Sequence, residues 1–481
     1  MNAAAALLAA GEPGRHALAC EGRALGYGDL AERVARVAGG LRALGIAPGE
    51  RVLLAAADGF DWVAAHLGAI WAGAVSVPLN PRLSPEVLAH VAAESDARLL
   101  VCERRHELDL AQAAVQDLAQ APGIEPHPVA GEAAAFWVYS SGSTARPKAV
   151  IHAHRAIGGC AAFAREVLAL GPDDRLFSTS RLTFAYPLAN SLYAGLSLGA
   201  RVLLDPRWPD AKSSVDAALT GAASVMFSVP TLYRAMLDSG QAARLRKSAL
   251  RWVVSAGESL PAALAERWQR ETGVAMIGGY GMSETLALVL YRREPDEAFA
   301  RPAPLAEVRA EPAVSDGAPQ RLWFRHPSVA LGYCRRPELQ AANFRDGWCS
   351  AGDLFHQPVP GGWLFAGRED DWVKIAGRWV GVVEVETAIS RQCGPLVKEL
   401  ALAAVDDADG LCALAAFASA DAASAPEVLA AAIAQLPKHQ RPRWVHWLPA
   451  LPRTTTGKLG RAELLALHRD SLKTASAKGE G

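Results

Sequence analysis

The segment YSSGSTARPKAVIHAH, residues 139–154, holds three serines, a threonine and a lysine just after an apolar, strand-like run. Hydroxylated residues at the end of a strand supply side-chain and backbone donors, and Lys148 adds a positive charge, which together suit phosphate oxygens. The segment is not the GxxxxGK[ST] phosphate loop, and alone it is also typical of a solvated turn. It indicates a phosphate site only in the company of other motifs.

Four further segments accompany it along the chain. They are GYGMSET (279–285), WCSAGDL (348–354), GREDDWVKIAGRWVGVVEVE (367–386) and LPRTTTGKLGRAEL (451–464). In order and separation the five segments resemble the signature motifs of the adenylate-forming superfamily, which includes acyl- and aryl-CoA synthetases, nonribosomal adenylation domains and luciferases. The resemblance covers nearly the whole chain.

The resemblance implies a ligase that uses ATP and Mg²⁺. A carboxylate attacks the α-phosphate of ATP, pyrophosphate leaves, and the acyl-adenylate is then transferred to a thiol. Triphosphate, magnesium, adenosine and carboxylate must therefore be held together in one site. The family's members act on small-molecule carboxylic acids.

The resemblance also assigns roles at the phosphates. Ser283 is expected at the α-phosphate, and Glu284 as the ligand of Mg²⁺, a hard cation that favours carboxylate oxygen. Lys458 is expected to bridge the carboxylate and the α-phosphate, so Lys458 and Glu284 are the expected catalytic residues. The expected binding residues of the loop are Ser140, Ser141, Gly142, Ser143, Thr144 and Lys148.

At the adenosine, Tyr280 is expected to lie against adenine, beside Gly281. Asp353 is expected to accept hydrogen bonds from both ribose hydroxyls, since a carboxylate has two acceptor oxygens. Arg368 is expected to assist at the ribose. The wall facing Tyr280 is expected to comprise Ala256, Gly257 and Glu258.

Each of these residues also has an ordinary explanation when taken alone. Asp353 suits a turn after a glycine, Lys458 a solvated surface, Glu284 the start of a helix, and Tyr280 a half-buried core. The presence of all five motifs favours the functional interpretation. His152 and His154, spaced as HxH, lack partners for a metal site and are expected to pack or to support the site.

The order of the apolar runs predicts an α/β fold with a covered parallel sheet, because strand-like runs alternate with helical ones through the first 260 residues. The resemblance implies a large N-terminal domain of parallel βα subdomains, with a small β-barrel-like subdomain from about residue 320. A small mobile α+β domain follows. We expect the domains at residues 1–369 and 370–481, with Asp370 as the hinge between two arrangements.

The thiol is expected to be coenzyme A, and the phosphopantetheine arm of an acyl carrier protein is the alternative. Gly377 is expected to leave room for the pantetheine arm, although an ordinary hairpin turn would require the same residue. The segment HQRPR, residues 439–443, departs from the family pattern at its first two positions.

The run Phe184-Ala185-Tyr186 is most similar to benzoate-CoA ligases and their aryl relatives. Amino-acid-activating members place an aspartate where Ala185 stands, so an α-amino acid substrate is disfavoured. An aromatic acid is expected, and a short or medium fatty acid is the alternative. The expected acid pocket, mostly apolar and able to hold a flat ring, comprises Phe184, Ala185, Tyr186, Gly278, Gly279, Met282, Leu286 and Ala287.

The composition also favours an enzyme that acts on small molecules. Lysine plus arginine (49) nearly balance aspartate plus glutamate (50), so neither nucleic acid nor an anionic membrane is expected as a partner.

The seven cysteines show no CxxC spacing and are expected as buried free thiols in a reducing cytoplasm. Uncharged stretches at 63–81 and 182–200 approach membrane-spanning length, but their prolines and polar residues favour a buried helix followed by a strand. The oligomeric state is not predicted.

A non-catalytic nucleotide-binding relative is a further alternative. Ala145 and Ala149 stand where the family has glycine, and a Cβ there could crowd the polyphosphate or restrict the loop.

Overall fold

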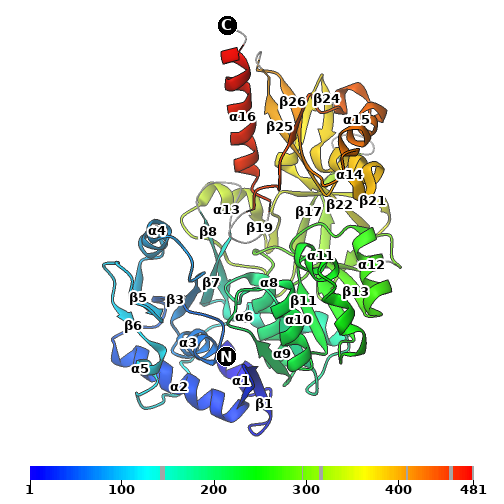
Figure 1. Cartoon of the computed structure of the whole chain (residues 1–481). Coiled ribbons are helices and arrows are strands. Elements are labelled where there is room, and N and C mark those ends of the chain that lie inside the picture. The colour runs from blue at the N-terminus through cyan, green and yellow to red at the C-terminus, as the bar shows by residue number, and fades with distance from the viewer. Residues whose placement is uncertain (141–146, 295, 314–317, 408–409, 454–458, 479–481) are drawn as a thin grey trace. The chain divides into compact units, whose positions relative to one another are not determined.

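The computed structural model describes the chain except residues 141–146, 295, 314–317, 408–409, 454–458 and 479–481 (Figure 1). Its residues form two compact units, which are described one at a time. The first unit comprises Met1–Arg309 and Trp323–Ala351, and the second comprises Ala310–Leu322 and Gly352–Gly481.

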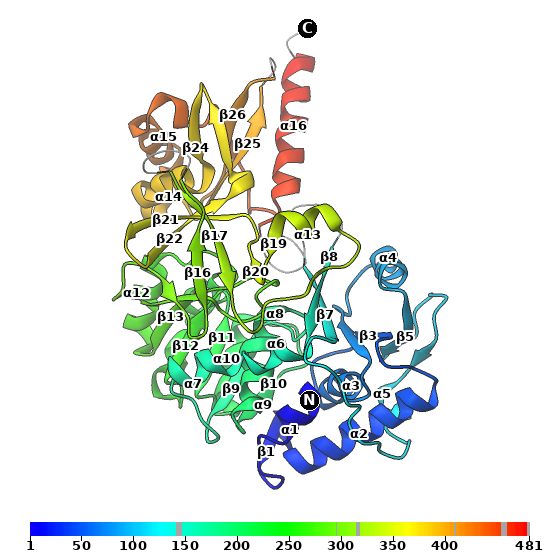
Figure 2. The ribbon, with the colours of Figure 1, turned by 180° about the vertical axis from the view of Figure 1, so that it is seen from behind.

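A seven-stranded sheet forms one half of the first unit, with the strand order β18-β8-β7-β4-β3-β5-β6. Alternate residues of the interior strand β3 face opposite sides: Val52 and Leu54 pack in one buried cluster, and Leu53 in another. Helices therefore cover both faces, α2 and α3 on one and α4 on the other (Figures 1 and 2). The elements are β3 (Arg51–Ala55), β4 (Val75–Pro78), β5 (Ala97–Cys102), β6 (Gln112–Ala113), β7 (Ala134–Ser140), β8 (Lys148–Ala153), β18 (Gly332–Tyr333), α2 (Tyr27–Ala43), α3 (Phe60–Trp71) and α4 (Pro85–Ser95).

A nine-stranded sheet forms the other half, with the order β15-β14-β13-β12-β11-β9-β10-β1-β2 and six parallel strands from β13 to β1. Its neighbouring residues Val253 and Val254 again enter different buried clusters. The elements are β1 (His16–Cys20), β2 (Arg23–Gly26), β9 (Arg175–Ser178), β10 (Arg201–Leu204), β11 (Val225–Ser228), β12 (Trp252–Ser255), β13 (Ala275–Tyr280), β14 (Leu290–Glu294), β15 (Arg301–Pro302), α7 (Ala161–Glu166), α10 (Ala211–Thr220), α11 (Pro230–Asp238) and α12 (Ala262–Thr272).

The two uncharged stretches lie in the core of this unit. Every residue of α3 from Trp62 to Ile70 is buried, and strand β4 follows, as the sequence predicts. The second stretch forms α8 (Ala185–Pro187), a π-helical segment (Leu188–Tyr193) and α9 (Ala194–Ser197) before β10. Across the described part of the chain, no helix is long and apolar enough to span a membrane. Six of the seven cysteines are buried, and Cys412 is half-buried.

The predicted β-rich region from residue 320 is an antiparallel sheet. Strand β17 (Gln320–Arg325) pairs with β20 (Trp348–Cys349) in the first unit and with β21 (Asp353–Val359) in the second, where β22 (Gly362–Arg368) continues the sheet. Its remaining strands are β16 (Glu307–Ala310) and β19 (Phe344–Arg345). Among the described strands no pairing joins β19 to β22, so the sheet is open there.

The rest of the second unit is a compact α+β structure, as predicted. A three-stranded sheet packs its apolar face against α14 and α15 through Ile389, Leu402, Leu414 and Leu429. The predicted domain boundary at residues 369 and 370 falls in a 3₁₀ turn, Glu369–Asp371, and its role as a hinge stays a prediction. The elements are β23 (Trp372–Ile375), β24 (Arg378–Gly381), α14 (Val382–Cys393), β25 (Glu399–Asp406), β26 (Cys412–Ser419), α15 (Ala425–Gln435), β27 (Trp444–Trp447) and α16 (Arg461–Lys478).

Candidate active site

The segment with the hydroxylated residues lies between two paired strands. Ser140 ends β7, Lys148 begins β8, and the two residues face each other in the antiparallel ladder. Five predicted site residues lie outside the described part of the chain, and their roles stay predictions: Ser141, Gly142, Ser143, Thr144 and Lys458.

Lys148 is held by a buried carboxylate. Its Nζ lies 2.8 Å from Glu284 Oε1, and the exposed fraction of the side chain is 19% for Lys148 and 3% for Glu284. Tyr333 completes the arrangement, since its hydroxyl donates to the same carboxylate oxygen at 2.6 Å and accepts a bond from Asn343 Nδ2 at 3.2 Å. Burial, and then the negative charge of Glu284, raise the pKa of the Tyr333 hydroxyl. The structure thus brings Lys148 and Glu284, the residues predicted at the phosphates and at Mg²⁺, into direct contact.

Hydrogen bonds from two sides fix the loop that carries Glu284. The Thr285 hydroxyl accepts a bond from the Met282 amide at 3.1 Å, and the Ala330 amide donates to the Glu284 carbonyl at 2.8 Å. Leu286 adopts a left-handed φ of 60°, a conformation that costs about 1–2 kcal/mol for a bulky residue. The surrounding bonds hold this strained turn in place.

His152 supports the same loop through the backbone of Ser283. Its Nε2 lies 2.9 Å from the carbonyl oxygen of Ser283, so this nitrogen carries the hydrogen, and the ring stacks on Phe136 at 4.9 Å. Burial lowers the pKa of His152 to about 4, so the imidazole is neutral at pH 7. The sequence predicts a supporting rather than a metal-binding histidine, and this contact agrees with it.

The proposed acid-pocket residues of α8 and β13 all belong to the first unit. Ala185 is buried, and the Tyr186 hydroxyl donates to the Val254 carbonyl at 2.9 Å, which fixes the ring edge-on to Phe227. A Cβ on Gly279 would lie 2.7 Å from Leu288 Cδ1, so a larger residue there would have to displace the buried Leu288 side chain. The exposure of this set is mixed: Leu286 and Ala287 are buried, whereas Phe184, Gly278 and Met282 are half-buried.

The predicted adenine wall follows β12. Gly257 has a φ of 87°, and Glu258 Oε2 accepts bonds from the Thr231 amide at 3.2 Å and hydroxyl at 2.6 Å. Glu258 therefore stabilises the first turn of α11, and its place in the adenine wall stays a prediction. Tyr280, at the end of β13, packs against Phe324 with the ring centroids 5.7 Å apart. A Cβ on Gly281 would lie 2.8 Å from the Ala287 carbonyl oxygen, so the turn itself requires this glycine. Both segments follow the carboxyl ends of parallel strands, where ligands of α/β sheets bind.

The two residues predicted at the ribose lie in the second unit. Asp353 and Arg368 face each other across β21 and β22, with Arg368 Nε 3.5 Å from Asp353 Oδ1. Gly377 and Ala376 form the two-residue turn between β23 and β24, with φ values of 77° and 49°. A Cβ on Gly377 would meet nothing within 4 Å, so the hairpin alone accounts for this glycine.

Comparison with known proteins identifies the family. The family model described as "AMP-binding enzyme" matches residues 6–334, which include Lys148, Glu284 and Tyr333. The chain is a member of the AMP-binding enzyme family. It is 34% identical to the 3-hydroxybenzoate–CoA/4-hydroxybenzoate–CoA ligase of Thauera aromatica over 95% of this chain and 94% of that protein. It is 31% identical to the benzoate–CoA ligase of the same organism over 95% of this chain and 93% of that protein.

A solved structure has the same architecture. The benzoate CoA ligase from Burkholderia xenovorans LB400 superposes with a TM-score of 0.87 at 31% identity, over 97% of this chain and all of that one. The predicted α/β fold with a smaller C-terminal part is therefore confirmed for this AMP-binding enzyme.

Tyr333 and Asn343 are the contacts of this AMP-binding enzyme that sequence reasoning missed. They come from the two-residue strand β18 and from α13 (Pro337–Asn343), outside every motif. The segment LGYCRRPEL carries no signal of its own beyond the proline that begins the helix. Only the pairing of β18 with β8 brings Tyr333 beside Lys148.

Proposed function

We propose that this AMP-binding enzyme is an aryl-CoA ligase that activates a benzoate-type acid with ATP and transfers the aryl group to coenzyme A. The observation that carries the proposal is the buried contact between Lys148 and Glu284, which joins the hydroxylated loop to the GYGMSET segment. The benzoate– and hydroxybenzoate–CoA ligases that resemble the chain over nearly its full length support the choice of acid and thiol.

The residues at this contact fit the charges of Mg²⁺ and triphosphate. The described residues contain no group of three or more His, Cys, Asp or Glu side chains that could hold a metal. Mg²⁺ suits such a site, because it is commonly held by one or two carboxylates together with substrate phosphates. Glu284 would be the carboxylate ligand, and the metal would neutralise charge on the phosphates. Lys148 would then exchange Glu284 for phosphate oxygen.

The other roles follow the motif positions. The hydroxylated loop would hold the β- and γ-phosphates, Ser283 the α-phosphate, and Tyr280 with the segment after β12 the adenine. Asp353 and Arg368 would hold the ribose. Lys458 would stabilise the charge that develops as the acid oxygen bonds to the α-phosphorus and pyrophosphate leaves. Residues 370–481 would rotate about Asp370 to admit the thiol past Gly377.

An aromatic acid suits the residues around α8. Ala185 offers no counter-charge for an ammonium group, and the Tyr186 hydroxyl is engaged with the Val254 carbonyl at 2.9 Å, so the ring presents mainly apolar surface. Ala287 is small, which leaves space for a ring substituent beyond a bare benzoate. A hydroxylated benzoate is therefore a reasonable first substrate to test.

The test is acid-dependent exchange between ATP and pyrophosphate over a panel of benzoates, hydroxybenzoates and fatty acids. Exchange with aromatic acids and loss of exchange in Lys458→Ala are expected. No exchange with any acid would refute the enzyme, and exchange with hexanoate but no benzoate would refute the aryl substrate. Thioester formation with free CoA and with a holo acyl carrier protein then identifies the acceptor; loading of the carrier alone would refute CoA.

A further inference from the structure

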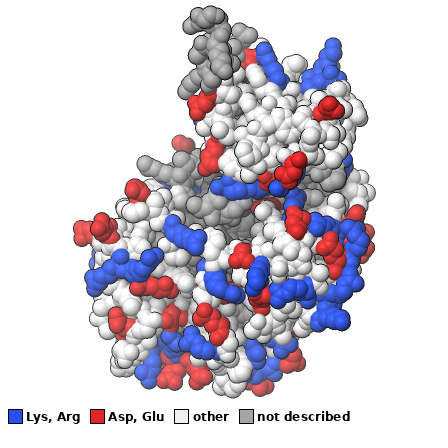
Figure 3. Space-filling model, in the orientation of Figure 1, with Lys and Arg blue, Asp and Glu red and all other residues white. Residues whose placement is uncertain are grey.

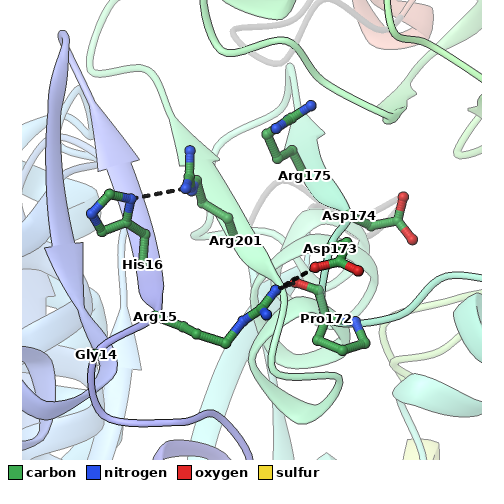
Figure 4. A pocket seen from close by; sticks show the side chains of 8 residues that line it. All are labelled: Gly14, Arg15, His16, Pro172, Asp173, Asp174, Arg175 and Arg201. Atoms are coloured by element: carbon green, nitrogen blue, oxygen red, sulfur yellow. Dashed lines mark hydrogen bonds and ion pairs between the residues drawn. The ribbon is translucent and has the colours of Figure 1, made fainter.

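A polar recess of about 330 Å³ lies in the first unit, where three parallel strands begin. His16 starts β1, Arg175 starts β9 and Arg201 starts β10, and Arg15, Asp173 and Asp174 complete the charged lining (Figure 4). Phe184 follows the carboxyl end of β9, and the adenine-type segments follow the carboxyl ends of β12 and β13. The recess therefore lies at the amino ends of the parallel strands, whereas the candidate active-site segments follow their carboxyl ends.

The two acidic residues of the recess already have basic partners. Asp173 Oδ1 pairs with Arg15 at 2.8 Å, as Figure 4 shows, and the exposed fraction of its side chain is 94%. Asp174 pairs with Arg251 at 2.6 Å and accepts a bond from the Gly171 amide at 2.8 Å. Neither carboxylate is left to balance the other two arginines.

Arg175 and Arg201 have no acidic partner among the described residues. Arg175 Nε donates to the Ala222 carbonyl at 2.7 Å, and the Arg201 guanidinium donates to His16 Nδ1 at 2.8 Å. Arg201 Nε is buried and meets no acceptor in the part of the chain that the structure describes. Burial, and then the charges of Arg175 and Arg15, lower the pKa of Arg201. An anion between these guanidinium groups would offset the repulsion that Arg201 meets from Arg175 and Arg15.

This concentration of unbalanced charge differs from the face of the first unit that Figure 3 shows. On the face in Figure 3, basic and acidic side chains of the first unit are interspersed. Arginine suits a tetrahedral oxyanion, because its planar fork of donors matches phosphate oxygens in pairs. The volume of about 330 Å³ is at the lower end of ligand pockets, which span about 300–1,000 Å³. That is room for a phosphate group with a small organic substituent.

We propose that this recess binds a phosphate group, held by Arg175 and Arg201, with Arg15 leaving Asp173 to join them. The source is free phosphate or a small phosphomonoester. The site is separate from the ATP site, so it does not rest on the proposed ligase activity.

The test is calorimetric titration of the full chain with inorganic phosphate and with glycerol 3-phosphate, against chloride at constant ionic strength. Arg175→Gln/Arg201→Gln is expected to weaken binding at least about tenfold, since two charge-assisted contacts are lost. Arg246→Gln is the matched control, because its guanidinium also donates to backbone carbonyls, those of Arg270 and Glu271. Phosphate binding in the ATP site is common to all variants, so the difference between them reports the recess.

Two further variants keep the proposal testable if the double variant does not fold. Arg201→Lys keeps the charge but loses the fork and should bind phosphate several-fold more weakly. Asp173→Asn removes the acidic partner of Arg15, which keeps its bond to the Pro172 carbonyl at 2.6 Å, and should bind phosphate several-fold more tightly. Tighter binding of glycerol 3-phosphate than of inorganic phosphate would support an organic phosphate, and the reverse would support free phosphate. Equal binding by wild type and all recess variants would overturn the proposal. Acid-dependent pyrophosphate exchange should be unchanged in the recess variants.

Discussion

Lys148 and Glu284 are separated by 136 residues in the sequence, yet their charged groups are 2.8 Å apart in a largely buried setting. Each neutralises the other. A ligand that separates them must supply negative charge to Lys148 and positive charge to Glu284. Under the proposed function, magnesium-bound triphosphate would supply both.

Substitutions of this pair should have unequal costs. Lys148→Met leaves the Glu284 carboxylate, 3% exposed, without its cation, and should lower the free energy of unfolding by about 3 kcal/mol. Glu284→Gln leaves Lys148, which is more exposed and can reach water, and should cost less. Lys148→Met/Glu284→Gln should regain part of the loss. Urea unfolding of the four proteins measures this coupling, and strictly additive costs would contradict it.

Removing the Tyr333 hydroxyl should also lower the free energy of unfolding. Tyr333→Phe deprives Glu284 of a donor at 2.6 Å and Asn343 of an acceptor at 3.2 Å. A hydrogen bond to a charged group is worth about 1.5–3 kcal/mol, so the free energy of unfolding should fall by that amount. Tyr291→Phe, a ring packed on Phe163, serves as the control and should change stability little. Equal effects of the two substitutions on the free energy of unfolding would contradict a stabilising bond from the Tyr333 hydroxyl to Glu284.

The sequence predicted the residues that belong to motifs, but not those that reach the site through packing. Lys148 and Glu284 were both predicted at the phosphates, and they meet. Tyr333 was not predicted, because its position depends on the pairing of β18 with β8, a long-range contact without a local pattern. Helix α3 was predicted as buried and followed by a strand, because the prolines and polar residues of the uncharged stretch at 63–81 disfavour a membrane-spanning helix. The open form of the antiparallel sheet around β17 depends on the choice of strand neighbours, which periodicity does not determine.

Acid should destabilise the protein through its buried histidines. Burial lowers the pKa of His66 to about 3 and that of His152 to about 4. Below pH 6.5 these histidines bind protons in the unfolded chain but not in the folded chain. The free energy of unfolding therefore falls as the pH drops from about 6.5 towards 4, by about 2 kcal/mol per histidine at pH 5. His152→Gln keeps a donor for the Ser283 carbonyl and should reduce this dependence. His106→Gln is the control. Urea midpoints at pH 7.5 and 5.0 test the prediction, and an unchanged pH dependence in His152→Gln would contradict it.

The turn between β23 and β24 offers a stabilising substitution. Both central residues have positive φ, which defines a type I′ hairpin turn that favours Asn-Gly. Ala376→Asn should therefore raise the free energy of unfolding of the second unit by about 0.5–1 kcal/mol, and Gly377→Ala should lower it by about 1–2 kcal/mol. Thermal unfolding measures both. If thioester formation by Gly377→Ala falls far more than stability does, the pantetheine role of this glycine gains support over the turn alone.

Sequence and structure lead to different expectations for Ala149. The sequence suggested that a Cβ at positions 145 and 149 could crowd the polyphosphate. Ala145 lies outside the described residues, but Ala149 is fully buried within β8, opposite Tyr139. Its carbonyl accepts a bond from the Cys334 amide at 3.1 Å, so the strand is continuous there. Ala149→Gly should therefore cost about 1–2 kcal/mol, through backbone entropy and a lost buried methyl, without raising the rate. Urea unfolding and pyrophosphate exchange of this variant test the point, and a faster, equally stable enzyme would show that the methyl group does crowd the phosphates.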